Sequence, residues 1–274
     1  MSHVPQIALN NGVEIPQLGF GVWQVSTQDI EPAVAKALEV GYRHIDTAAM
    51  YGNEAGVGRA MRASGVHRDE IFVTTKLNND AHGSDAAQAA FDDSLDKLGL
   101  DHVDLYLIHW PMPDRNDYVE TWQGLEKIYA SGRARAIGVS NFQPSHLRRL
   151  VADTTVVPAV NQVEIHPTFA QEELRSLHTQ LGIKTEAWSP LGQSRDLDNA
   201  TVVSIAQRLG RTPAQVILRW HLQRGDVVFP KSVTPSRIVE NFGVFDFNLD
   251  DSDVSQISAL DTGKRIGPDP DRFN

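Results

Sequence analysis

The sequence predicts an α/β fold, a (β/α)8 TIM barrel with an N-terminal β-hairpin and one or two extra helices near the C-terminus. Eight short apolar segments alternate with amphipathic segments, a pattern typical of parallel strands joined by helices. The chain has 274 residues, the usual size of one such barrel. No stretch rich in Pro, Gly or Ser divides it, so residues 1–274 are expected to form a single domain. An open, doubly wound parallel sheet is the alternative.

The hairpin is predicted between Ile7 and Ile15, because Asn11-Gly12, a favoured two-residue turn, lies between short apolar flanks. The apolar segments that follow are each short enough for a buried strand. In chain order they are LGFGVW (18–23), YRHIDTA (42–48), IFVTTK (71–76), VDLYLIHW (103–110), AIGVSN (136–141), AVNQVEIH (159–166), KTEAWSP (184–190) and VVFPKS (227–232).

Helices are predicted between the strands from apolar residues spaced three or four apart. Ile30, Val34 and Leu38, for example, fall on one helical face. A helix pair around 200–224 adds one helix beyond a minimal barrel, and residues 261–274 are expected to form an irregular tail. Glycines that favour helix ends follow these segments, at Gly41, Gly65, Gly99, Gly132, Gly182 and Gly210.

Composition and charge exclude several classes of function. The net charge of −10 argues against nucleic-acid binding, which needs clustered Lys and Arg. The absence of cysteine excludes disulfides, thiolate catalysis and Cys-ligated zinc, and no metal is expected. The N-terminus MSHVPQIALNN does not resemble a signal peptide, and no apolar run approaches the ~20 residues of a membrane span. A cytoplasmic protein without membrane contact is therefore expected.

The usual fingerprint for dinucleotide binding, G-x-G-x-x-G, is missing. Segment 19–24 begins Gly-Phe-Gly but has Gln24 in place of the third glycine. Segment 56–61 begins Gly-Val-Gly but ends in Met61. Any dinucleotide must therefore bind by another route, which argues against a Rossmann dehydrogenase.

Four reactive side chains follow three successive predicted strands: Asp46, Tyr51, Lys76 and His109. Each alone also fits an ordinary role, as a helix cap, a packed ring, a solvated amine or a buried histidine. Chemistry on (β/α)8 barrels takes place at the carboxyl ends of the strands, so their coincidence there indicates one site.

Together these side chains make a proton donor. A Lys ammonium beside a Tyr hydroxyl favours the phenolate and lowers the Tyr pKa, while an Asp keeps the Lys charged and oriented. The Tyr can then act as a general acid near neutral pH. A neutral His can donate a hydrogen bond to a carbonyl oxygen that gains negative charge. Such a site suits carbonyl reduction, provided that a hydride donor is bound.

The sequence resembles the aldo-keto reductases over nearly its whole length, and most closely their bacterial 2,5-diketo-D-gluconate reductase-like branch. The resemblance implies NADPH-dependent reduction of aldehydes and ketones, with Asp46, Tyr51, Lys76 and His109 as catalytic tetrad and Tyr51 as acid. The motifs that carry it are GYRHIDTAAMYGNEAGVGRAM (41–61), FVTTKL (72–77), DLYLIHWP (104–111), GVSNF (138–142), NQVEIHP (161–167) and FPKSVTPSRIVEN (229–241).

The resemblance also implies that the cofactor, NADPH or NADP+, lies extended across the barrel mouth. Ser140, Asn141 and Gln162 are expected to hold the nicotinamide amide, since their side chains can donate and accept. Trp188 is expected to stack on the nicotinamide ring, where many relatives have Tyr. The remaining expected contacts are Gly21, Val22, Trp23 and Val233, Ser189, Leu191 and Gly192 along the pyrophosphate, Lys231, Ser232 and Arg237 at the 2′-phosphate, and Glu240 and Asn241 near the adenine.

Trp23 and Trp110 resemble walls of the substrate pocket, with Tyr51 and His109 as the other substrate contacts. The connection from Trp110 to Trp122 is short, and so is the C-terminal tail, so an open pocket is expected. The substrates expected for it are small polar carbonyls, α-dicarbonyls and keto sugar acids, read mainly at the carbonyl group.

Two other functions remain open at this point. One is an NADPH-binding sensor or regulatory subunit with little turnover, as in potassium-channel β-subunits of the same fold. The other is a different barrel enzyme, such as a phosphosugar isomerase, which needs no nicotinamide. A monomer is expected, because no exposed apolar helix demands a partner.

Overall fold

Eight parallel strands form a barrel in the computed structural model, which describes residues 4–274. Neighbours in the sheet follow chain order, and a parallel bridge between Leu18 and Val228 joins its two ends. The predicted (β/α)8 barrel is therefore confirmed, in place of the open sheet. Residues 1–3, the first three of the N-terminal segment that does not resemble a signal peptide, lie outside the described residues. The strands are β3 (Phe20–Gly21), β4 (His44–Asp46), β5 (Phe72–Leu77), β6 (Val103–Ile108), β7 (Ala134–Ser140), β8 (Val160–Glu164), β9 (Lys184–Trp188) and β10 (Val227–Val228).

The predicted hairpin is present and closes the amino end of the barrel. Its strands β1 (Gln6–Ala8) and β2 (Glu14–Pro16) pair antiparallel, with Ile7 opposite Ile15. Ile15 is fully buried in a cluster with residues of the barrel interior such as Leu105. Asn11 Nδ2 at the tip donates to the carbonyl oxygen of Arg135 at 2.9 Å, which anchors the turn.

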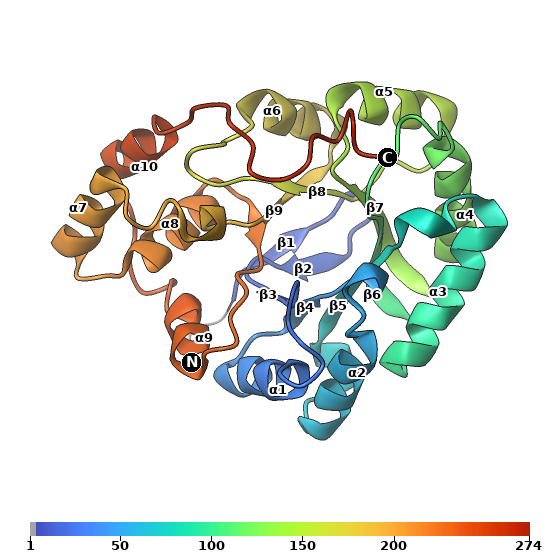
Figure 1. The fold of residues 1–274 in the computed structure, drawn as a ribbon, viewed down its shortest axis with the longest axis horizontal. Coiled ribbons are helices and arrows are strands. Elements are labelled where there is room, and N and C mark those ends of the chain that lie inside the picture. Colours follow the sequence, from blue (N-terminus) through green and yellow to red (C-terminus); the bar gives the residue numbers. More distant parts are fainter. Residues whose placement is uncertain (1–3) are drawn as a thin grey trace.

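The helices form an outer ring around the strands (Figure 1). Ile30, Val34 and Leu38 are all buried on the inner face of the first helix, as predicted, and each contributes about 1.5–3 kcal/mol relative to an exposed side chain. Two helices, α7 and α10, come in addition to the eight that alternate with strands. The α-helices in residues 4–274 are α1 (Ile30–Val40), α2 (Glu54–Ala63), α3 (Ser84–Leu98), α4 (Tyr118–Ala130), α5 (Pro144–Asp153), α6 (Glu172–Leu181), α7 (Ala200–Leu209), α8 (Pro213–Gln223), α9 (Pro235–Phe242) and α10 (Asp251–Ser258).

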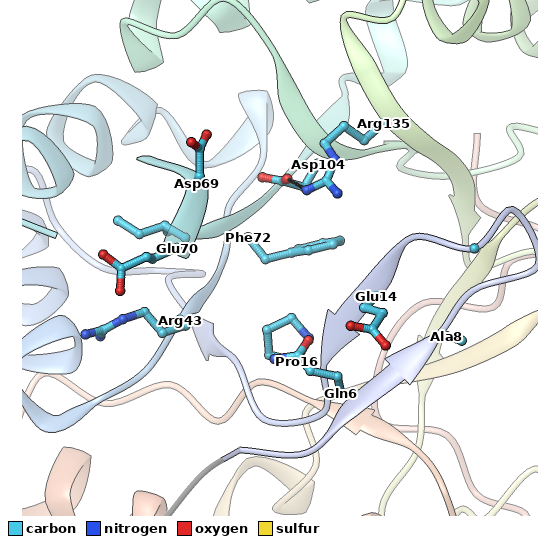
Figure 2. Close-up of a pocket in the computed structure, with 12 residues that line it drawn as sticks. Gln6, Ala8, Glu14, Pro16, Arg43, Asp69, Glu70, Phe72, Asp104 and Arg135 are labelled. Atoms are coloured by element: carbon cyan, nitrogen blue, oxygen red, sulfur yellow. Dashed lines mark hydrogen bonds and ion pairs between the residues drawn. The ribbon is translucent and has the colours of Figure 1, made fainter. Parts of the chain in front are cut away.

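A cavity of about 650 Å³ lies between the hairpin and the amino ends of β4 to β7 (Figure 2). Its walls include Arg43, Phe72 and Asp104. Asp104 is engaged with protein groups, since it accepts a hydrogen bond from Arg135 at 2.7 Å. The cavity is at the end of the barrel opposite the predicted catalytic residues. Within residues 4–274, none of the helices combines the length and apolar character needed to cross a bilayer.

Candidate active site

The predicted catalytic residues come together at the carboxyl ends of β4, β5 and β6. Lys76 on β5 is fully buried, and its Nζ donates to Asp46 Oδ1 at 2.7 Å and to the carbonyl oxygen of Thr47 at 2.9 Å. Its third neighbour is the hydroxyl of Tyr51, at 3.4 Å. Tyr51 ends the short 3-10 helix η1 (Ala49–Tyr51) that follows β4. All three hydrogens of the ammonium therefore have partners.

The protonation states of this group follow from burial and charge. Burial alone would lower the pKa of Lys76, but the acidic groups around it, Asp46 foremost, together outweigh burial, so that pKa lies above its usual value. Burial raises the pKa of Tyr51, and the opposing charge of Lys76 does not outweigh it. The prediction that Lys76 would lower the Tyr51 pKa overall is therefore wrong, although Lys76 acts in that direction. At neutral pH Tyr51 keeps the proton that a general acid must supply.

His109 lies beside Tyr51, directly after β6. The centroids of the two rings are 5.7 Å apart in an edge-to-face arrangement. Burial, and then the charge of Lys76, hold the pKa of His109 well below its usual value, so the imidazole is neutral at neutral pH. Its Nδ1 is buried and has no hydrogen-bond partner in the described part of the chain. A neutral imidazole carries one N–H, which is what a hydrogen bond to a carbonyl oxygen requires.

The side chains expected at the nicotinamide form one hydrogen-bonded chain. Ser140 Oγ donates to the carbonyl oxygen of Gln162 at 2.8 Å. Asn141 Nδ2 donates to the carbonyl oxygen of His109 at 3.0 Å, and Trp188 Nε1 donates to Asn141 Oδ1 at 2.8 Å. The ring of Trp188 is therefore held in place before any cofactor binds.

Gln162 supplies the free acceptor of this group. Its Nε2 donates to Asp46 Oδ2 and to Glu186 Oε2, both at 2.8 Å. Both amide hydrogens are then used, and Oε1 has no partner within residues 4–274. A carbonyl oxygen left free in a polar barrel mouth matches the N–H groups of a carboxamide, so these residues fit the nicotinamide of NADPH.

The strand β3 approaches the opposite side of the mouth closely. A Cβ on Gly21 would lie 2.6 Å from the carbonyl oxygen of Phe229, so only glycine fits there. Val22 is buried and its N–H donates to the carbonyl oxygen of Asp46 at 3.2 Å. Trp23 follows and is 45% exposed, which places a large free ring at the edge of the mouth.

The segment after β9 turns sharply through residues expected along the pyrophosphate. Ser189 has a φ of +50° and Gly192 a φ of +57°, and Leu191 between them is half-buried. A Cβ on Gly192 would lie 2.5 Å from Asp196 Oδ2, so glycine is needed there for space as well as for φ.

The cations expected at the 2′-phosphate are available. Lys231 and Arg237 are exposed, and neither forms an ion pair with another side chain of the described residues. Ser232 is buried, and its Oγ accepts a hydrogen bond from the N–H of Thr234 at 3.1 Å, just before α9. Val233 between them is 45% exposed. Two unpaired cations beside a hydroxyl suit a phosphate.

The residues expected near the adenine lie on α9. Glu240 Oε1 accepts a hydrogen bond from Thr212 Oγ1 at 2.8 Å, which ties α9 to the start of α8. Asn241 is buried. Glu240 therefore has a structural contact of its own, independent of any cofactor.

The C-terminal tail lies across the mouth and supplies residues that the sequence analysis missed. In Figure 1 it passes from α10 along α6 and β8 toward α5. Glu164 at the end of β8 accepts hydrogen bonds from the N–H groups of Ile266 at 2.6 Å and Gly267 at 2.9 Å. Phe273 packs on Trp110 with 4.5 Å between ring centroids. The substrate pocket is therefore more enclosed than the short C-terminal tail predicts.

Glu164 is also linked, through His166, to the loop after β9. His166 is fully buried, and its ring nitrogens lie 3.0 Å from Glu164 Oε1 and 3.1 Å from Asp196 Oδ2. Although burial would lower the pKa of His166, the two carboxylates raise it above its usual value. The sequence gives no sign of this contact, because Asp196 lies thirty positions after His166 in a separate segment (196 minus 166). Within residues 4–274, no cluster of three or more His, Cys, Asp or Glu side chains has the arrangement of a metal site.

Comparisons with known proteins agree with this geometry. Residues 17–262 match the model of the Aldo/keto reductase family. An aldo-keto reductase of Mycolicibacterium smegmatis is 56% identical over 98% of both chains. The methylglyoxal reductase DkgA of Escherichia coli K12 is 50% identical over 100% of this chain and 99% of its own. Among solved structures, a variant of Gox0644 in complex with NADPH superposes over 100% of both chains with a TM-score of 0.96 and 44% identity.

Proposed function

The chain belongs to the aldo/keto reductase family and is an NADPH-dependent oxidoreductase, and we propose that it reduces small polar carbonyl compounds, α-dicarbonyls above all, with Tyr51 as the proton donor. The observation that carries this proposal is the contact of Tyr51 with Lys76, 3.4 Å from hydroxyl to ammonium, inside a buried group that also holds Asp46.

In this proposal the chain moves one proton and stabilises one charge. When bound, NADPH supplies the hydride that adds to the carbonyl carbon. Tyr51 gives its hydroxyl proton to the carbonyl oxygen, and the neighbouring ammonium of Lys76 stabilises the phenolate that is left. Neutral His109 donates a hydrogen bond to the same oxygen and so orients the substrate. The product is the alcohol.

The preference for α-dicarbonyls is proposed from reactivity and from one relative. A second carbonyl next to the first withdraws electron density and eases hydride attack. Trp23, Trp110 and Phe273 offer aromatic walls, and apolar walls discriminate weakly between substrates, so little strong discrimination is expected. The E. coli relative is named a methylglyoxal reductase.

The test is a panel of carbonyl compounds with NADPH consumption as the readout. We expect kcat/KM for methylglyoxal and other α-dicarbonyls to exceed that for simple aldehydes, and that for steroid ketones by more still, because the second carbonyl eases hydride attack. The difference should be roughly tenfold or more, and the apolar walls alone could contribute only about 10–200-fold. A marked preference for a steroid, or for one sugar over every dicarbonyl, would contradict the proposed substrate class.

A second expectation concerns the choice of NADPH over NADH. Arg237→Ala should raise the Kd of NADPH by roughly 10–100-fold and that of NADH by little, since charge-assisted hydrogen bonds contribute about 1.5–3 kcal/mol. Arg148→Ala, which removes another exposed arginine on α5, is the matched control and should leave both values unchanged. Binding is measured by titration with each cofactor. Equal losses for both cofactors would show that Arg237 does not contact the 2′-phosphate.

A further inference from the structure

Glu186 is a buried acid that the proposed proton transfer does not use. It lies on β9, is fully buried, and points into the barrel two residues before Trp188 on the same face of the strand. Its Oε2 accepts the hydrogen bond from Gln162 Nε2 at 2.8 Å. Its Oε1 is buried and has no partner in the described part of the chain. Burying a carboxyl oxygen without a hydrogen-bond partner costs folding free energy, so its presence here calls for an explanation.

Glu186 and Asp46 share one amide. Gln162 Nε2 has two hydrogens, and one goes to each carboxyl group, at 2.8 Å in both cases. If the amide were turned over, its oxygen would face the Asp46 carboxylate, which cannot donate, and that hydrogen bond would be lost. Asp46 therefore fixes which end of the Gln162 amide faces the barrel mouth, and Glu186 holds the amide there through the second hydrogen bond. That end is Oε1, an acceptor.

The charges around Glu186 set its protonation. Burial, and then the negative charge of Asp46 on β4, raise the pKa of Glu186 to about 8, although Gln162 and the charge of Lys76 on β5 oppose this. Its register partners on the flanking strands, Gln162 on β8 and Val227 on β10, carry no charge. Near neutral pH Glu186 is therefore largely protonated, and it ionises as the pH rises past about 8.

We propose that Glu186 is a positioning residue for the nicotinamide: through the shared amide it holds the Gln162 carbonyl toward the carboxamide of the cofactor, and its own ionisation adds a negative charge near the nicotinamide site. This inference rests on the cofactor contacts proposed above, and not on the identity of the carbonyl substrate.

Two consequences follow for the cofactor. Without a hydrogen-bond partner at position 186, the Gln162 amide keeps only its hydrogen bond to Asp46 and is held less firmly, so the contact with the carboxamide weakens. With an ionised Glu186, the positively charged ring of NADP+ gains attraction that the neutral ring of NADPH does not. The Kd of NADP+ relative to that of NADPH should therefore fall as the pH rises through about 8.

The experiment measures binding in Glu186→Leu and Glu186→Gln. Leucine fills similar volume but has no acceptor, whereas glutamine keeps an acceptor and copies the protonated acid. The probes are NADPH, NADP+ and 2′,5′-ADP, which carries the 2′-phosphate but no nicotinamide. At about pH 7, Glu186→Leu should weaken NADPH binding by roughly tenfold, the effect of one lost hydrogen bond, and 2′,5′-ADP binding by less than about twofold. Glu186→Gln should bind both within about twofold of the unmodified protein.

The pH dependence provides the second measurement. In the unmodified protein the ratio of the Kd of NADP+ to that of NADPH should fall several-fold between about pH 6.5 and 9.5, and in Glu186→Gln it should stay flat. The 2′-phosphate titrates in both cofactors, so its effect cancels in this ratio. This pH measurement, which needs only the unmodified protein and Glu186→Gln, still tests the proposal if Glu186→Leu does not fold.

Three results would overturn the inference: unchanged NADPH binding in Glu186→Leu, an equal loss for 2′,5′-ADP, or the same pH dependence in Glu186→Gln as in the unmodified protein. Failure of the carbonyl panel would contradict the proposed substrate class and leave these binding results intact, so the two proposals fail separately.

Discussion

Replacement of Tyr51 by Phe should lower kcat for carbonyl reduction by roughly 10²–10⁴-fold, the usual contribution of a general acid. The Kd of NADPH should stay within about twofold, because the change removes only a hydroxyl. The ring keeps its packing against His109, 5.7 Å away between centroids, and its place 5.0 Å from the ammonium of Lys76. Steady-state kinetics with methylglyoxal and titration with NADPH check the two halves of this expectation.

Tyr106→Phe is the matched control for this change. Tyr106 lies on β6, is fully buried, and its hydroxyl has no hydrogen-bond partner among the described side chains and backbone groups. Its replacement should leave kcat unchanged within about twofold, because no proton passes through it. If Tyr51→Phe retained turnover close to that of Tyr106→Phe, Tyr51 would not be the proton donor.

The barrel is predictable from sequence because its strands are short and apolar on both faces. All six residues of β5 and all six of β6 are buried, as helices on the outside and side chains on the inside require. The predicted segments 18–23 and 227–232 form strands of only two residues each, β3 and β10, joined to one another by the single bridge from Leu18 to Val228. In the second, Pro230 has no N–H to donate, so the ladder ends before it.

The meeting of the catalytic residues is also predictable, since strand order in a barrel places their ends together. The pKa values of these residues are not predictable in the same way. The sequence predicts that Lys76 lies near Tyr51. It does not predict that the effect of burial on the Tyr51 pKa exceeds the opposing effect of the Lys76 ammonium, so that this pKa is raised. Burial is a property of the whole packed site and has no local signal in the chain.

Contacts between distant segments account for what the sequence analysis missed. Phe273 lies in an irregular tail with no periodicity, yet it packs on Trp110, 163 positions earlier in the chain (273 minus 110). Glu186 looks like an ordinary polar residue of a strand end until its register with Gln162 is known. Such residues become visible only when the strands are placed side by side.

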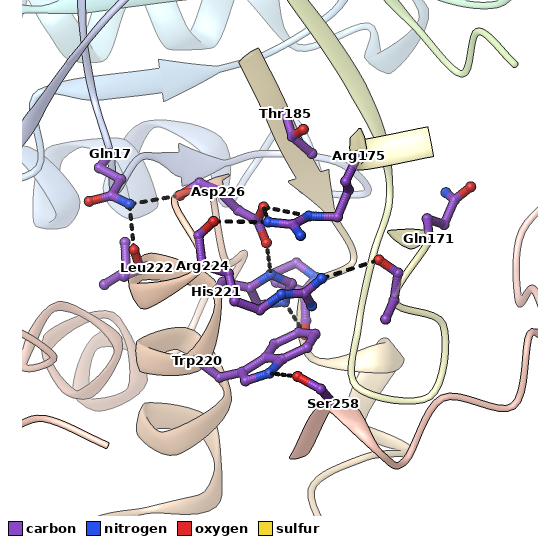
Figure 3. A network of polar contacts seen from close by, with 12 residues as sticks. Gln17, Gln171, Arg175, Thr185, Trp220, His221, Leu222, Arg224, Asp226 and Ser258 are labelled. Carbon is purple, nitrogen blue, oxygen red and sulfur yellow. Dashed lines mark hydrogen bonds and ion pairs between the residues drawn. The ribbon is translucent and has the colours of Figure 1, made fainter. Parts of the chain in front are cut away.

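Asp226 is the centre of a buried ion network that ties α6, α8 and β10 together (Figure 3). It is fully buried, and its carboxylate accepts from Arg175 Nη2 at 2.8 Å and lies 3.0 Å from His221 Nδ1. Its backbone carbonyl accepts from Gln17 Nε2 at 3.1 Å. Burial alone would raise the pKa of Asp226, but His221 and the nearby arginines outweigh it and hold that pKa below its usual value. The carboxylate is therefore ionised in the folded protein at neutral pH.

Asp226→Asn should lower the free energy of unfolding by about 3–5 kcal/mol at neutral pH, because the largely buried guanidinium of Arg175 loses its buried counter-charge and keeps only the exposed carboxylate of Glu172. Urea denaturation measures the change. Glu39→Gln breaks an ion pair with Lys36 in which Glu39 is 70% exposed, and as a control it should cost less than about 1 kcal/mol.

The effect of Asp226 should also depend on pH. A group whose folded pKa lies below its unfolded pKa stabilises the protein above the unfolded pKa, and this stabilisation is lost as the pH falls through the folded pKa. The gap between the unmodified protein and Asp226→Asn should therefore narrow in acid, below about pH 4. A loss no larger than that of Glu39→Gln, or a gap that does not narrow in acid, would show that the charge of Asp226 does not hold these elements together.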